Sequence, residues 1–115
     1  MNQEIEIKLE KRAAVTLFDI QGDVTTFAEP FFEEAYKSAN DQGATKILLK
    51  FHEDAYINSG GIAVLIQMLA ETRKNDQKVA ITGLSKHFQK IFSMVGITKF
   101  ASIYSTVDEA LEALK

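Results

Sequence analysis

The chain has 115 residues, 46% hydrophobic and 25% charged, which is typical of one globular domain with a single core. Its net charge of −3 is spread along the sequence, which disfavours nucleic acid or an anionic membrane as a partner. The absence of cysteine excludes disulfides, thiolate metal sites and thiol catalysis. Residues 1–4 are polar and no apolar run reaches the roughly 18 residues of a membrane span, so we expect a cytoplasmic protein.

The first half of the chain predicts a hairpin, a helix and a central strand. Apolar residues alternate with charged ones over residues 5–9 and recur over 15–20, which indicates two strands joined by a tight turn. Thr25 or Thr26 is a candidate cap for a helix with Pro30 in its first turn. Its apolar residues recur at helical spacing: Phe27, Phe31, Phe32, Ala35, Tyr36 and Ala39. The continuous apolar run 47–49 predicts a strand covered on both faces.

The second half alternates helices with short strands. A mostly apolar helix over residues 62–69 follows residues 58–61, and a buried strand over 79–81 ends at Gly83. Ser85 is a candidate cap for a third helix, which Gly96 closes in a left-handed conformation. A short strand at 103–104 precedes a last helix, where Thr106 and Glu109 have the spacing of a capping box.

This element order predicts the fold class. Two strands followed by alternating helices and strands indicate a single α/β domain over residues 1–115. Its mixed, mostly parallel sheet starts with a β-hairpin and is accompanied by about four helices. Both a three-layer arrangement and a two-layer arrangement with helices on one face are compatible with this order. We expect Met68 and Met94 to fill gaps in the core.

The residues offer little for catalysis, and we predict no catalytic residue, no metal, no cofactor and no enzyme activity. His52 and His87 are the only histidines, and His52 with its two acidic neighbours is at most a weak cation site. The pair Gly60-Gly61 lacks the Lys-Ser/Thr ending of a phosphate-binding P-loop. The central strand ends Leu-Lys-Phe, without the acceptor aspartate of a receiver domain.

Residues 56–62, Tyr-Ile-Asn-Ser-Gly-Gly-Ile, lead from a strand end into a helix. They resemble the signature of the STAS domain (sulphate transporter and anti-sigma factor antagonist), in which an aromatic and a hydrophobic residue precede Asp-Ser-Ser/Thr/Ala-Gly-Leu/Ile. The resemblance extends to residues 22–24, 47–49, 83–85 and 91–97, and so covers nearly the whole chain in the expected order.

The resemblance implies a phosphorylation switch in a protein-binding module. In anti-sigma factor antagonists of this family, an anti-sigma factor that is also a serine kinase phosphorylates the serine that matches Ser59 and is thereby released; a serine phosphatase is a possible further partner. The implied partner-binding residues are Tyr56, Asn58, Ser59, Gly60 and Gly61. We expect the two glycines to let a partner backbone approach closely, and the apolar excess of helix 62–69 to form an adjoining hydrophobic patch.

The residues leave alternatives open. Asn58 or Ser59 can simply cap the helix. Thr25, Lys50 and Asn58 stand where the family usually has aspartate, and Gly60 replaces a common hydroxyl or alanine. A STAS interaction subunit of a transport or sensory complex that works without phosphorylation is one alternative. A small-ligand or nucleotide-binding domain that uses the helix start at residues 59–61 as an anion site is the other.

Overall fold

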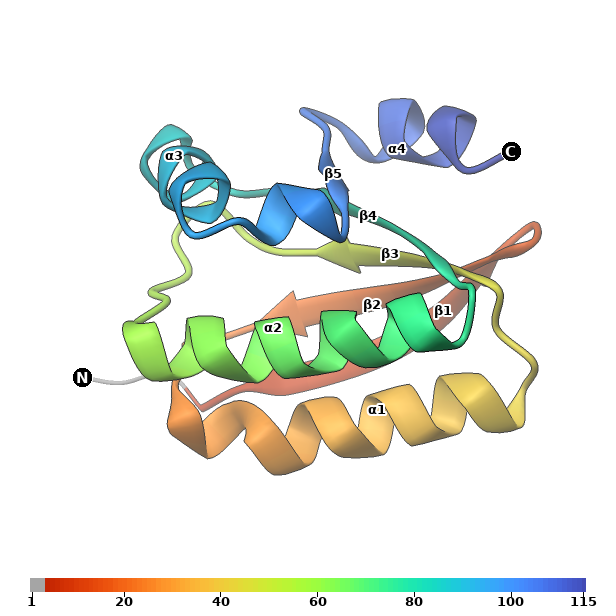
Figure 1. Ribbon diagram of the computed structural model, residues 1–115, viewed down its shortest axis with the longest axis horizontal. Helices are drawn as coiled ribbons and strands as arrows, with labels where there is room; N and C mark the ends of the chain where they lie inside the picture. Colours follow the sequence, from red (N-terminus) through yellow and green to blue (C-terminus); the bar gives the residue numbers. More distant parts are fainter. Residues whose placement is uncertain (1–3) are drawn as a thin grey trace.

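The computed structural model describes residues 4–115, so the polar start at Met1, Asn2 and Gln3 lies outside the described residues. One five-stranded sheet organises the chain, in the order β1 (Glu6–Arg12), β2 (Val15–Gln21), β3 (Lys46–Lys50), β4 (Lys78–Thr82) and β5 (Ser102–Ile103). The pair β1–β2 is antiparallel and every later pair is parallel (Figure 1). The predicted mixed sheet with an initial hairpin and a central third strand is therefore confirmed.

Helices lie on both faces of this sheet (Figure 1). The helices α1 (Glu29–Asp41) and α2 (Ser59–Lys74) run side by side below it in this view, and α4 (Val107–Ala113) lies above it. The remaining helix α3 (Lys86–Met94) and the 3-10 turn η2 (Ile97–Lys99) add Phe92 and Ile97 to the core that α1 and α2 share with the sheet. The arrangement is thus three-layered. Between residues 4 and 115 no helix combines the length and apolarity needed to cross a bilayer.

Strand alternation divides the buried side chains between the two faces. On β2, Phe18 and Ile20 belong to the larger core with α1 and α2, whereas Val15 and Leu17 belong to a smaller core with α4. On β3, Leu48 alone among the apolar residues faces α4. Most of the buried apolar side chains therefore lie between the sheet and the helices α1 and α2.

Helix starts and stops largely follow the predicted caps. The hydroxyl of Ser85 accepts a hydrogen bond from the Phe88 amide at 3.2 Å, and that of Thr106 accepts one from the Glu109 amide at 3.1 Å. Gly96 has φ 85°, as a left-handed helix end requires. Thr25 caps the 3-10 turn η1 (Thr26–Ala28), which comes before α1.

Two of the apolar residues that the sequence predicts to be buried are more than 80% exposed. Met68 is buried as expected, but Met94 is 84% exposed, so its predicted core position is wrong. Met94 follows the buried Phe92 by two residues, a rotation of about 200° around the helix axis, which turns it to the outside. Phe27 is 86% exposed because it belongs to η1 and is out of phase with the buried face of α1.

Candidate functional site

The start of α2 is fixed by Asn58. Its backbone is extended, and its side-chain Oδ1 accepts a hydrogen bond from the Gly61 amide at 2.9 Å. Asparagine is among the preferred capping residues because its short side chain reaches an amide of the first turn. The cap is therefore Asn58, and Ser59 is the first helical residue.

A segment distant in sequence holds this junction in place. The Val24 amide donates to the Tyr56 carbonyl at 2.8 Å, and the Asn58 amide donates to the Val24 carbonyl at 3.2 Å. Val24 and Ile57 thus form an isolated parallel bridge, and both side chains are buried. The entry to α2 is tied to the loop before α1, beyond the ends of β2 and β3.

The two glycines allow this packing. A Cβ on Gly61 would overlap the Val24 carbonyl, and a Cβ on Gly60 would overlap the Thr26 hydroxyl. The space that we expected a partner backbone to use is therefore filled by the chain's own residues. Gly61 is buried against Val24, whereas Gly60 is partly exposed.

Ser59 itself is exposed. Among the described residues, its hydroxyl has no hydrogen-bond partner, and the amides of Ser59 and Gly60 have no acceptor. The hydroxyl is accessible to solvent, and two amide donors lie beside it at the positive end of the helix dipole. The site can accept a modification without losing a structural hydrogen bond.

Two exposed aromatic residues belong to the segments that meet at the start of α2. Tyr56 is 57% exposed three residues before Ser59. Phe27 follows Thr26, whose side chain touches Gly60. Large exposed aromatic residues are frequent anchors in protein interfaces. The sequence pattern does not reveal that Thr26 packs against Gly60, because the bridge between Val24 and Ile57 joins segments that are far apart in the chain.

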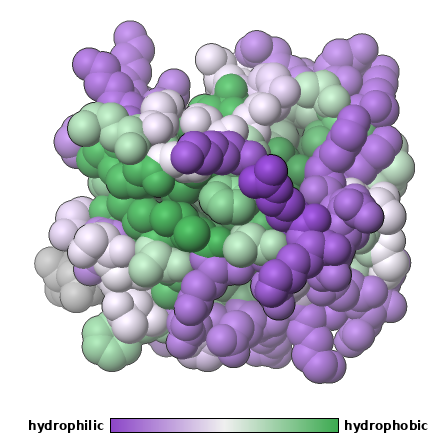
Figure 2. All heavy atoms as spheres, in the orientation of Figure 1, coloured by the Kyte–Doolittle hydropathy of each residue, from purple (hydrophilic) through white to green (hydrophobic). Residues whose placement is uncertain are grey.

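A hydrophobic surface adjoins the start of α2. Figure 2 shows green side chains gathered between α3 and the N-terminal half of α2. These helices offer the half-buried Ile62 and Ile66 and the exposed Met94 and Val95. The predicted patch was too broad on α2, since its other large apolar residues are buried in the core: Val64, Leu65, Met68 and Leu69.

Lys50 does not join this surface. It follows Leu48 by two residues on β3, so its side chain belongs to the sheet face covered by α4, opposite the layer that contains Ser59. Asp19 on β2 pairs with Lys50 in the sheet register, and its carboxylate oxygen Oδ1 lies 2.8 Å from His52 Nε2. Within residues 4–115, no three histidine or acidic residues form a metal-binding group.

The comparisons identify the family. Residues 6–110 match the model of the STAS domain. The chain belongs to the STAS domain family. An anti-sigma-B factor antagonist of Staphylococcus aureus is 22% identical over 78 residues, which span 68% of this chain and 72% of that relative.

Solved structures support the same STAS fold. An anti-sigma factor antagonist from Mycobacterium paratuberculosis has a TM-score of 0.79 and 17% identity, with 96% of this chain and 94% of that one covered. The Bacillus cell fate determinant SpoIIAA in its phosphorylated form has a TM-score of 0.67 and 18% identity, with 96% and 100% covered. At such identities the similarity establishes the fold of this STAS domain.

Proposed function

We propose that this STAS domain is an anti-sigma factor antagonist that docks a kinase-type anti-sigma factor at the start of α2 and releases it when Ser59 is phosphorylated. The observation that carries the proposal is the exposed hydroxyl at the first helical position, which has no hydrogen-bond partner within residues 4–115, while Asn58 provides the cap. The protein acts in the cytoplasm by binding, not by catalysis. A serine phosphatase would restore the binding form.

Relatives support both parts of this proposal. The similar Staphylococcus aureus protein is named an anti-sigma-B factor antagonist. SpoIIAA, which shares the fold, has been solved in phosphorylated and unphosphorylated forms. A phosphate-dependent change of partner is thus a reasonable function for the matching position here.

The proposed docking surface consists of Phe27, Tyr56, Asn58, Ser59 and Gly60. Gly61 lies below this surface, where its lack of a side chain lets the start of α2 pack against Val24. The aromatic residues supply apolar contact area, and Ser59 lies where a phosphate would add about 1.5 to 2 negative charges. The free amides of the first turn and the helix dipole would stabilise that phosphate. The fold would persist while the charge and shape of the docking surface change.

Asn58 and Thr25 bear on the chemistry of the switch. Both are uncharged where the family usually has aspartate, so neither repels a phosphate on Ser59. The absence of these acids also removes groups that help a kinase orient the hydroxyl. A stable phosphorylated form and slow phosphorylation are both consistent with this arrangement.

Phosphorylation is tested by incubating the protein with ATP and a kinase-type anti-sigma factor encoded in the same genome, followed by mass spectrometry. We expect one phosphate, on Ser59, and none on the Ser59→Ala variant. The variant Ser105→Ala is the control, since Ser105 is also exposed and also precedes a helix. A protein that stays unmodified, or a phosphate on another residue, would refute the switch.

Binding is tested separately by calorimetry with the same partner in the absence of ATP. Phe27→Ala and Tyr56→Ala should each weaken binding by about tenfold or more. If the partner binds but Ser59 is never modified, the alternative of a STAS interaction subunit without phosphorylation is favoured. Tight binding of a nucleotide to the isolated protein would favour the ligand-binding alternative.

A further inference from the structure

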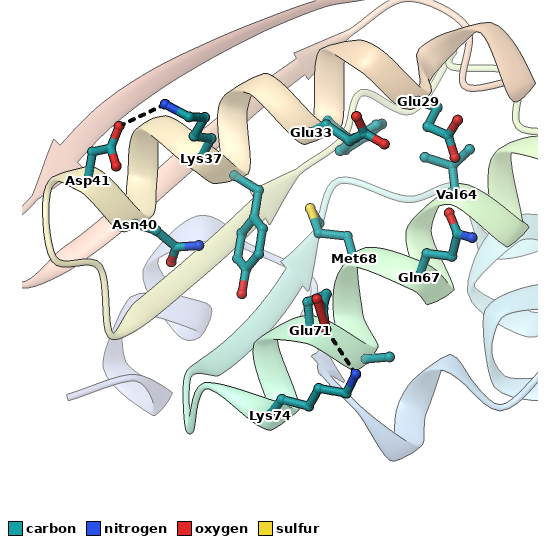
Figure 3. A pocket seen from close by; sticks show the side chains of 13 residues that line it. Glu29, Glu33, Lys37, Asn40, Asp41, Val64, Gln67, Met68, Glu71 and Lys74 are labelled. Carbon is teal, nitrogen blue, oxygen red and sulfur yellow. Dashed lines mark hydrogen bonds and ion pairs between the residues drawn. The ribbon is translucent and has the colours of Figure 1, made fainter.

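An open groove of about 640 Å³ runs between α1 and α2, from Glu29 and Val64 at one end to Asp41 and Lys74 at the other (Figure 3). Its floor is apolar, because Phe32, Val64 and Met68 line it and are themselves almost fully buried in the core. The Met68 side chain points into the groove, and a thioether adapts readily to different apolar neighbours. The groove is thus already formed, but little of its apolar floor is exposed, and most of its accessible surface belongs to Tyr36 and the polar rim.

One end of the groove is closed by a hydrogen-bond network. The Tyr36 hydroxyl donates to Gln77 Oε1 at 2.7 Å and accepts from Asn75 at 2.9 Å. The Gln77 amide in turn donates to Asn40 at 2.6 Å. Since these side chains form hydrogen bonds with one another, a partner at this end would be recognised through apolar contact and charge rather than through these polar groups.

The rim carries excess negative charge. Four carboxylates and two lysines line the groove, and the lysines already have partners: Lys37 lies 3.5 Å from Asp41, and Lys74 lies 3.4 Å from Glu71. Glu29 and Glu33 have no cationic partner in the described part of the chain. They lie on α1 at the end of the groove near Val64 (Figure 3). A cationic partner is the electrostatic complement of this end.

We propose that the α1–α2 groove binds a basic amphipathic helix of a partner protein. The two walls are helices whose backbone groups are bonded internally, so the groove offers no strand edge to an extended peptide. Between Glu29 and Asp41 the groove extends for about 18 Å, which fits a helix of about 12 residues. Apolar residues of that helix cover the Tyr36 ring and the narrow exposed edges of Val64 and Met68, and its lysines or arginines contact Glu29 and Glu33.

The probe is a fluorescent helical peptide of about 14 residues made only of leucine and lysine, with leucines along one face. We expect saturable binding by fluorescence anisotropy at up to millimolar protein. Amide shift changes in NMR spectra should be concentrated in α1 and in the half of α2 that begins at Val64. Raising the salt concentration should weaken binding, because the rim contacts are exposed ion pairs.

Charge reversal decides between this groove and non-specific attraction. The variant Glu29→Lys with Glu33→Lys should weaken peptide binding by about tenfold or more. Its control, Glu34→Lys with Glu112→Lys, changes the net charge equally at exposed residues that do not line the groove, and should weaken it by less than about threefold.

Other outcomes overturn the proposal. Absence of saturable binding, equal losses in the two charge-reversed variants, or shift changes concentrated between α2 and α3 would each refute it. The inference is independent of the proposed phosphorylation switch. Ser59→Ala should leave peptide binding unchanged, so failure of one proposal is distinguishable from failure of the other.

Discussion

At the residue scale, Gly60 and Thr26 form a matched pair. The Thr26 hydroxyl occupies the space that a side chain at position 60 would need. The STAS signature that residues 56–62 resemble has a hydroxyl residue or alanine at that position, and here the side chain of Thr26, from another loop, fills the space. The pair explains why glycine is compatible with the packing of this helix start.

The first prediction concerns this pair. Gly60→Ala should lower the free energy of unfolding by about 1–3 kcal/mol, because the new methyl group overlaps the Thr26 side chain. In a Thr26→Ala background the same change should cost little or stabilise, since alanine restricts the unfolded chain more than glycine does. Urea denaturation of the two single variants and the double variant measures the coupling. Additive effects would contradict the pairing.

The second prediction separates the cap from the charge of Asn58. Asn58→Ala removes the acceptor of the Gly61 amide and should lower the unfolding free energy by about 0.5–2 kcal/mol. Asn58→Asp keeps an acceptor and places a negative charge at the helix start, which should stabilise by about 0.3–1 kcal/mol at low salt. Urea denaturation with and without added salt tests both. Equal losses for alanine and aspartate would show that Asn58 Oδ1 is not the cap.

At the scale of elements, the helix bounds that differ between sequence prediction and structure do so because of residues next to the helix ends. Most helices were predictable because a capping residue marks the start and helical spacing marks the buried face, as for Ser85 and Thr106. The start of α1 was less clear, because Thr25 caps a 3-10 turn and Phe27 extends the aromatic pattern without being buried. The exposed Met94 shows that an apolar residue near a helix end need not face the core.

The third prediction concerns α4, a helix of seven residues held to the sheet mainly by Ala110 and Leu114. Thr106→Ala removes its cap and should destabilise by about 0.5–2 kcal/mol. Because α4 has a core of its own, the loss should appear as faster hydrogen exchange in residues 107–114, with amides of α2 unchanged. Thr98→Ala, at an exposed position in η2, is the control. Equal acceleration throughout the protein would instead show that α4 unfolds only with the rest.

At the scale of the whole molecule, topology was easier to predict than the contacts between distant loops. The alternation of elements determines a mixed sheet with crossover helices. It does not determine which face α4 covers, nor the bridge from Val24 to Ile57, which pairs residues more than thirty positions apart. That bridge brings Thr26 against Gly60, and a single sequence holds no local pattern that reveals it. The groove likewise depends on how α1 and α2 pack together.

The fourth prediction follows from this arrangement, in which the Ser59 side chain lies outside both cores. Ser59→Glu should leave the fold intact and raise the unfolding free energy by about 0.3–1 kcal/mol, because a negative charge at a helix start is favourable. Thermal denaturation and NMR spectra check this, with shift changes expected near residues 24–27 and 56–63.

The same variant should weaken binding of the kinase-type anti-sigma factor, although a glutamate carries less charge than a phosphate. Its matched control is Ser105→Glu, which adds a charge before the cap of α4, in the layer on the opposite side of the sheet. Calorimetry should show weaker binding for Ser59→Glu and unchanged binding for Ser105→Glu. Equal affinities would mean that the partner does not contact the start of α2. Loss of the fold in Ser59→Glu would mean that a phosphate there acts by disrupting the domain, whereas a surface switch requires that the rest of the molecule stay unchanged.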